Sequence, residues 1–271
     1  MASQTYSLEK GWRILLEELC ISAQDVLRHA RLPLDLLLRK IPAVTAVEYF
    51  RFWEGLAHVS QNDPVLLLRL VQNVTAETMD PAIFACLSSN NLNIALNRIA
   101  IYKPMVAPVT LTVEQTTQDT SVTFARTSHN GSAPPFFIAF ELAFWVHLAR
   151  MATREHILPK AVHMPLDLPG LETYEAFFGT RICQNEPNRL TFTAVDAQKP
   201  FLTVNHAMWE ILEPALNKRM ENLTPTASTR DRVRACLIEM IASGEYSITA
   251  VASKLAISNR TLQRHLRQEG T

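Results

Sequence analysis

Glycine and cysteine are scarce in this chain, and each scarcity excludes a class of protein. Seven glycines among 271 residues leave no glycine-rich loop of the kind that cradles a phosphate group. The four cysteines, Cys20, Cys86, Cys183 and Cys236, lie far apart in the sequence, which argues against a disulfide framework and against a zinc site. We therefore expect a protein of a reducing compartment, the cytoplasm, without a metal or another cofactor.

Net charge and long hydrophobic runs are lacking as well. The 26 basic and 26 acidic side chains cancel, so composition as a whole indicates neither a nucleic-acid binder nor a membrane-surface protein. The most apolar run, residues 136–148, contains Glu141 and is too short to span a bilayer. The N-terminus lacks the basic and then apolar layout of a signal peptide. We expect no membrane partner, and a hydrophobic content of 48% is enough for one large and one small domain.

Hydrophobic spacing predicts an α+β fold, with a mixed helical and α/β domain over residues 1–221. In the first hundred residues, apolar positions recur every three or four residues, which indicates short helices. Apolar and polar residues then alternate from Val109 to Val113 and from Val122 to Phe124, which predicts a β-hairpin. Further strands are expected over 161–164 and 189–194, and further helices over 136–154, 174–178 and 205–220.

The end of the chain predicts a separate unit of three helices. Residues 222–229 are mostly small and polar and contain Pro225, as interdomain linkers usually do. Residues 230–271 follow as a helix over 230–242, a short helix opened by Ser247, and a third helix over 259–268 capped by Ser258. Leu262 and Leu266 are expected to face inward, while Ala252 is small enough to let two helices cross closely.

The outward residues of the third helix indicate DNA binding. A duplex major groove admits one helix, and from Arg230 onward seven basic and four acidic residues give a local charge of +3. Arg260 and Arg264 can each bond to the guanine edge, and Gln263 to the adenine edge. The remaining residues expected at DNA are Asn259 and, against phosphates, Arg267, Lys254 and Arg230.

Residues 248–252 and 257–266, followed by Glu269-Gly270-Thr271, resemble the first helix-turn-helix of the AraC/XylS family of regulators. The larger domain resembles the arabinose-binding-type regulatory domain of one branch of that family. The residues that carry this second resemblance are Pro159 with Val162, Tyr174 with residues 177–179, and residues 190–192 and 199–202. The resemblance implies a bacterial-type transcription regulator whose N-terminal domain binds a small-molecule effector or forms a homodimer, and whose C-terminal domain binds double-stranded promoter DNA.

The resemblance also implies that part of the DNA-binding domain is absent. Members of the family carry two helix-turn-helix units joined by a long helix, and this chain stops at Thr271, where that helix is expected to begin. The sequence is therefore expected to be a fragment or a naturally shortened protein. An alternative follows, in which the chain is an effector- or partner-binding module whose shortened helix-turn-helix does not bind DNA.

An enzyme is not expected. The only neighbouring combinations of nucleophile, base and carboxylate are Cys183 with His163, Glu141 with His147, and Asp167, and none has a spacing typical of a catalytic site. Aromatic residues could instead line an effector cavity, although such residues belong to the core in most proteins. The candidates are Tyr102, Phe137, Trp145, Phe177, Phe178 and Trp209.

Overall fold

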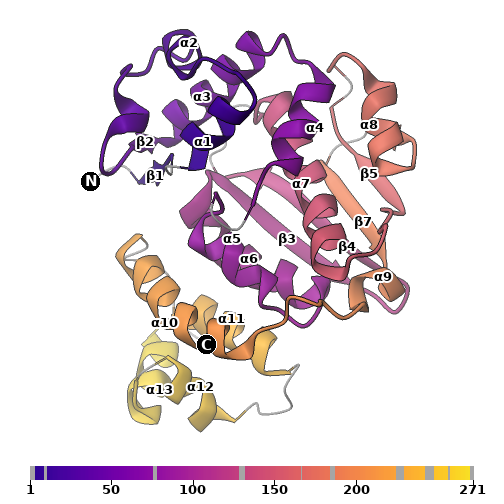
Figure 1. Ribbon diagram of the computed structural model, residues 1–271. Coiled ribbons are helices and arrows are strands. Elements are labelled where there is room, and N and C mark those ends of the chain that lie inside the picture. The colour runs from indigo at the N-terminus through magenta and orange to yellow at the C-terminus, as the bar shows by residue number, and fades with distance from the viewer. Residues whose placement is uncertain are drawn as a thin grey trace. The chain divides into compact units, whose positions relative to one another are not determined.

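The computed structural model describes residues 4–8, 11–75, 78–127, 132–165, 167–183, 187–223, 229–241, 247–255 and 257–268. The chain divides into two compact units, Met1–Glu213 and Pro214–Thr271. Helices and two sheets form the first unit, and helices form the described part of the second (Figure 1). The predicted α+β class is confirmed. Of the predicted linker, residues 224–228 lie outside the described residues.

The N-terminal part of the first unit is a cluster of short helices with a two-stranded sheet. It contains β1 (Thr5–Ser7), α1 (Gly11–Glu18), α2 (Ala23–His29), the 3-10 helix η1 (Leu36–Leu38), β2 (Ala43–Thr45), α3 (Ala46–Val59), α4 (Pro64–Gln72), α5 (Pro81–Leu87) and α6 (Leu92–Val106). Asp63 and Asp80 cap α4 and α5 by accepting hydrogen bonds from backbone N–H groups, and a proline follows each of them in the first turn. The helices predicted for this region are confirmed.

A glycine lets α2 and α3 pack closely. A Cβ atom at Gly55 would lie 2.5 Å from the carbonyl oxygen of Val26 and 3.0 Å from the Cβ atom of Ala30. Such distances are shorter than nonbonded contacts, so a larger residue would push the two helices apart. The close crossing holds the middle of α3, with the buried Phe52 and Trp53, against the core.

The second sheet has five strands in the order β3-β4-β7-β5-β6. Their bounds are β3 (Val109–Gln115), β4 (Asp119–Arg126), β5 (Ala161–His163), β6 (Ile182–Cys183) and β7 (Arg189–Thr193). β3 and β4 form the predicted hairpin, in which Leu111 pairs with Phe124 and Val113 with Val122. The other neighbours are antiparallel except for β5 and β6, which are parallel.

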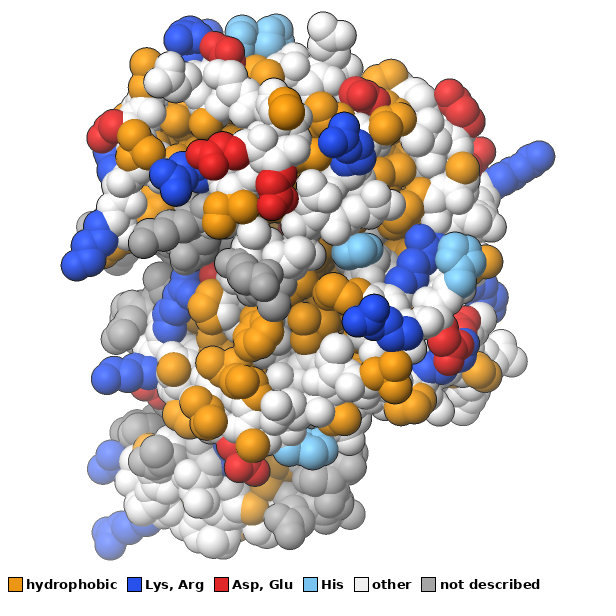
Figure 2. Space-filling model, viewed as in Figure 1, with side chains coloured by type: hydrophobic (Ala, Val, Ile, Leu, Met, Phe, Trp, Pro, Cys, Tyr) orange, Lys and Arg blue, Asp and Glu red, His pale blue; other side chains and the backbone are white. Residues whose placement is uncertain are grey.

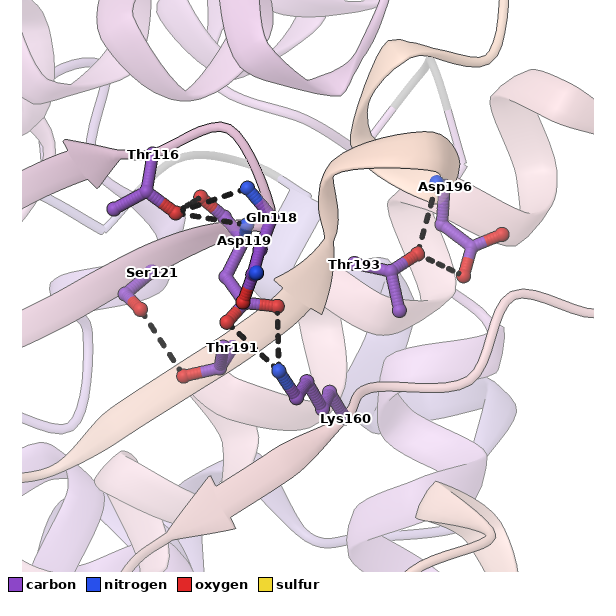
Figure 3. Close-up of polar contacts among 8 residues, drawn as sticks. All are labelled: Thr116, Gln118, Asp119, Ser121, Lys160, Thr191, Thr193 and Asp196. Atoms are coloured by element: carbon purple, nitrogen blue, oxygen red, sulfur yellow. Dashed lines mark hydrogen bonds and ion pairs between the residues drawn. The ribbon is translucent and has the colours of Figure 1, made fainter.

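Polar side chains form an ion pair and hydrogen bonds in the five-stranded sheet near the hairpin turn (Figure 3). Lys160 Nζ donates to both carboxylate oxygens of Asp119 at 2.8 Å. The hydroxyl groups of Ser121 and Thr191, which face each other across β4 and β7, lie 3.1 Å apart. Thr116 Oγ1 accepts a hydrogen bond from the backbone N–H of Asp119 at 2.9 Å. Because these contacts join the start of β4 to β7, to Lys160 before β5 and to the hairpin turn, they stabilise the strand ends.

A long apolar helix, α7 (Pro135–Thr153), forms the centre of the first unit. It packs against α3, α4 and α8 (Leu171–Phe178). Its length and composition would suit a membrane span, but 78% of its most apolar 18-residue window is buried inside the protein. α7 therefore has the character of a core helix, and the helix predicted over 136–154 is confirmed.

The remaining elements lead out of the first unit. α8 ends at Gly179, whose φ of +70° gives the left-handed C-cap that glycine favours, and the helix predicted over 174–178 lies within α8. Next come α9 (Ala194–Gln198) and α10 (His206–Leu223), and α10 crosses the boundary between the two units. The strands β1, β2 and β6 and the helix α9 were not predicted, and each has five residues or fewer.

Candidate nucleic-acid interface

Three helices of the second unit share a small hydrophobic core. They are α11 (Thr229–Ile241), α12 (Ile248–Lys254) and α13 (Asn259–Gln268). The buried residues are Cys236 and Met240 from α11, Val251 and Ala252 from α12, and Leu262 from α13. Partly buried side chains packed around them are Val233, Leu237, Ala250, Leu255, Ile257 and Leu266. The predicted inward positions of Ala252, Leu262 and Leu266 are confirmed.

Side-chain hydrogen bonds fix the turn between α12 and α13. Ser247 Oγ accepts from the N–H of Ala250 at 3.1 Å and so caps α12. Ser258 Oγ accepts from the N–H of Thr261 at 3.1 Å, which bears out the predicted cap of α13. The side-chain amide of Asn259 donates to Thr249 Oγ1 at 3.1 Å. This last bond joins the first turns of the two helices, so α13 is held at a fixed angle to α12.

The outward side of α13 carries a group of polar side chains that we call the arginine face, namely Arg260, Gln263, Arg264 and Arg267. All four are exposed, and together with Thr261 they line a shallow hollow on the surface of the helix. Lys and Arg side chains project from the α13 end of the second unit in Figure 2. The structure thus brings together on one surface the three predicted base-reading residues and one predicted phosphate contact.

The charge of this region has one sign. α12 and α13 contain Lys254, Arg260, Arg264 and Arg267 and no Asp or Glu. Arg260 and Arg264 are four residues apart, and like charges at that spacing destabilise a helix. A helix that keeps such a pair on an exposed face is well suited to an anionic partner.

The other predicted contact residues differ in their surroundings. Lys254 is half-buried at the end of α12, and Arg230 is exposed in the first turn of α11. Asn259 is half-buried, and its amide nitrogen is engaged by Thr249. Sequence reasoning did not foresee this positioning contact, although Asn259 lies at the helix start where such bonds are common.

Comparison with known families decides the class of protein. The N-terminal arabinose-binding domain of AraC transcription regulators matches residues 21–201. The chain belongs to the AraC family of transcription regulators. The transcriptional regulator CdpR from Pseudomonas aeruginosa, known from a crystal structure, is similar with a TM-score of 0.57 and 19% sequence identity, over 97% of this chain and 80% of that one. At that identity the likeness shows a shared fold. No curated protein matches the sequence.

AraC-family regulators are not a family of enzymes, and several residues considered for catalysis take part in the packing of the first unit. Glu141 binds Lys103, with Oε1 and Oε2 at 2.6 and 2.7 Å from Nζ. His147 is half-buried on α7, and burial lowers its pKa. His163 and Cys183, which were considered together from the sequence, are register partners on the parallel strands β5 and β6.

The aromatic residues considered for an effector cavity belong mainly to the core. Tyr102, Phe137, Trp145, Phe178 and Trp209 are buried, and Phe177 packs against the guanidinium group of Arg150. A pocket of the first unit is lined instead by other aromatic side chains, among them Trp12, Trp53, Phe140 and Phe144. Sequence spacing could not separate the two sets because both lie on amphipathic or fully apolar helices.

Proposed function

We propose that this chain is a sequence-specific DNA-binding regulator of transcription, in which α13 enters the major groove of promoter DNA. The observation that carries the proposal is the arginine face, held on a packed core by two capped helices. Residues 1–221 act as the regulatory domain, residues 222–229 as the linker and residues 230–271 as the groove-reading unit. The protein works in the cytoplasm, where its DNA is.

Each residue of the interface has a separate role. Arg260 and Arg264 present paired N–H donors, which match the O6 and N7 acceptors of guanine, and the amide of Gln263 matches adenine. Arg267, Lys254 and Arg230 bind phosphate oxygens, which adds affinity without sequence information. Asn259 acts through its bond to Thr249 by fixing the start of α13. A homodimer would present two such helices to two half-sites.

Alanine substitutions distinguish base reading from phosphate binding. We expect Gln263→Ala and Arg264→Ala each to lower affinity for the preferred sequence by about 1–3 kcal/mol and to relax base preference at one position. Lys254→Ala should instead weaken binding to all sequences alike and reduce the salt dependence by about one ion. Competition binding with single-base variants of a selected duplex measures both effects. Unchanged affinity and preference in both Gln263→Ala and Arg264→Ala would refute the assignment.

A further inference from the structure

A pocket in the first unit combines aromatic walls with a buried ion pair. It has a volume of about 100 Å³ and opens among α1, α3, α6 and α7. Trp12, Trp53 and Phe140 form one wall, with ring centroids 4.8 to 6.3 Å apart. Lys103 and Glu141 also line the pocket, and their side chains are only 3% and 5% exposed. Hydrophobic side chains gather over α5 and α6 on the face drawn in Figure 2.

The polar groups of this pocket include more hydrogen-bond donors than their neighbours satisfy. An ammonium group has three donors, and Lys103 directs two bonds to Glu141. The nearest acceptor for the buried indole N–H of Trp53 is the Tyr49 hydroxyl, and the geometry of that contact falls short of a full hydrogen bond. A buried donor without an acceptor costs free energy. An oxygen atom on a ligand would therefore be stabilised here.

The charges favour an uncharged ligand. The positive charge of Lys103 is already balanced by the carboxylate of Glu141 at 2.6 Å. Asp80, which also lines the pocket, accepts a hydrogen bond from the N–H of Ala82 as the cap of α5, so a ligand carboxylate would meet repulsion from two carboxylates. A ligand ammonium group placed near Trp53 would be repelled by the ammonium group of Lys103. Burial and the negative charge of Glu141 raise the pKa of the Tyr49 hydroxyl, which keeps that group neutral as well.

Size and shape favour a single ring. An apolar cavity of about 150 Å³ accepts benzene in another protein, and this pocket is smaller at about 100 Å³ but open at one side. The flat faces of Trp12, Trp53 and Phe140 match an aromatic ring, which packs against other rings in tilted or offset arrangements. A long acyl chain or a fused ring system would exceed this volume.

We propose that the pocket binds a small, uncharged, single-ring aromatic compound through a hydroxyl or carbonyl oxygen placed near Trp53 and Lys103. The role of this compound as the effector rests on the proposed function. The binding of the compound to the pocket is independent of DNA binding, because every residue of the pocket lies in the first unit.

One helix connects the pocket to α10. Lys103 lies on α6, and other residues of α6 pack on Trp209 of α10. The guanidinium carbon of Arg98 lies 3.5 Å from the centroid of the Trp209 ring, and the centroids of the Tyr102 and Trp209 rings are 6.3 Å apart. Pro104 follows Lys103 inside α6 and lacks the N–H that would continue the helix hydrogen bonds. A ligand that shifts Lys103 therefore acts on a deformable position of the helix that holds the start of α10.

Titration with four single-ring probes tests the proposal. The intact chain is titrated with phenol, toluene, benzoate and benzylamine, and tryptophan fluorescence and calorimetry are recorded. We expect saturable binding of one phenol per chain, and affinity at least about tenfold lower for each of the other three, the equivalent of about 1.4 kcal/mol. Equal affinity for all four probes, tighter binding of a charged probe, or no saturable binding of phenol would overturn the proposal.

Three variants test whether phenol occupies this pocket. Val106→Phe adds a ring to the pocket wall and should abolish phenol binding, whereas Val65→Phe, at an exposed position of α4 outside the pocket, should leave binding unchanged. The double variant Lys103→Met/Glu141→Leu removes both charges together and leaves only the Trp53 N–H as a donor, so it should bind phenol with a smaller preference over toluene than the original chain. An undiminished preference for phenol in the double variant, or phenol binding by a folded Val106→Phe variant, would contradict the assignment.

DNA binding separates this inference from the proposed function. If phenol binds as expected but leaves DNA affinity unchanged, then the pocket assignment holds and the effector role is refuted. If the chain binds no DNA, the proposed function fails, while the phenol titration still reports on the pocket.

Discussion

Replacing Lys103 with methionine is expected to lower the free energy of unfolding of the first unit by about 3–5 kcal/mol, because the change leaves a buried carboxylate without its partner. Lys103 and Glu141 are joined by two hydrogen bonds, and their side chains are only 3% and 5% exposed. Methionine keeps most of the side-chain volume, so the loss should come from charge rather than from a cavity. Chemical denaturation followed by far-ultraviolet circular dichroism measures the change.

Two control variants show whether the loss of stability comes from the unpaired buried charge. Removing both charges in Lys103→Met/Glu141→Leu should restore most of the lost stability, since a buried ion pair and a well-packed apolar pair are often similar in free energy. Lys160 pairs with Asp119, and the Lys160 side chain is 51% exposed. Lys160→Met should therefore change the free energy of unfolding by only about 0–1 kcal/mol. A similar loss in both single variants would mean that burial does not set the strength of the Lys103–Glu141 pair.

Replacing Leu262 with alanine is expected to cost about 2–5 kcal/mol, the range for truncating a buried leucine. Leu262 is 1% exposed and lies in the core shared by α11, α12 and α13. A unit of this size has a small free energy of unfolding. The variant should therefore lose the ordered structure of these helices and, with it, DNA binding. Hydrogen exchange should show lost protection in α11 and α13 and unchanged protection in α7.

Ile248 provides the matched control for Leu262. It lies in the same unit but is 47% exposed at the start of α12, and Ile248→Ala should change stability by no more than about 0.5 kcal/mol. If Leu262→Ala keeps full DNA affinity, then either the helices do not depend on this core or α13 does not carry the interface.

Much of the fold could be predicted from local patterns. The alternation from Val109 to Phe124 requires a strand pair, and the turn residues between them set the register. Ser258 marks the start of α13 because a serine there can cap the helix. Short elements such as β6 and α9 could not be predicted, because their few residues carry no period of their own and depend on contacts formed by the rest of the fold.

The two candidate sites differ in how far the sequence specifies them. The arginine face comes from one helix, so the spacing of Arg260, Gln263 and Arg264 is enough to place these residues on one side. The pocket instead collects Trp12, Trp53 and Glu141 from three helices. The partner of Glu141, Lys103, is 38 residues away, and no local pattern links the two. A charged residue inside an apolar run was the one signal in the sequence, because buried charges need partners.

Sequence selection from a pool of random duplexes tests the central claim most directly. The 271-residue chain is compared with a triple variant, Arg260→Ala/Gln263→Ala/Arg264→Ala, at low and raised salt. We expect the original chain to enrich a common sequence, and the triple variant to retain only weaker, salt-sensitive binding without enrichment. If the two proteins enrich the same sequence, or if neither binds DNA, then α13 does not read bases and the chain acts through ligands or protein partners of its first unit.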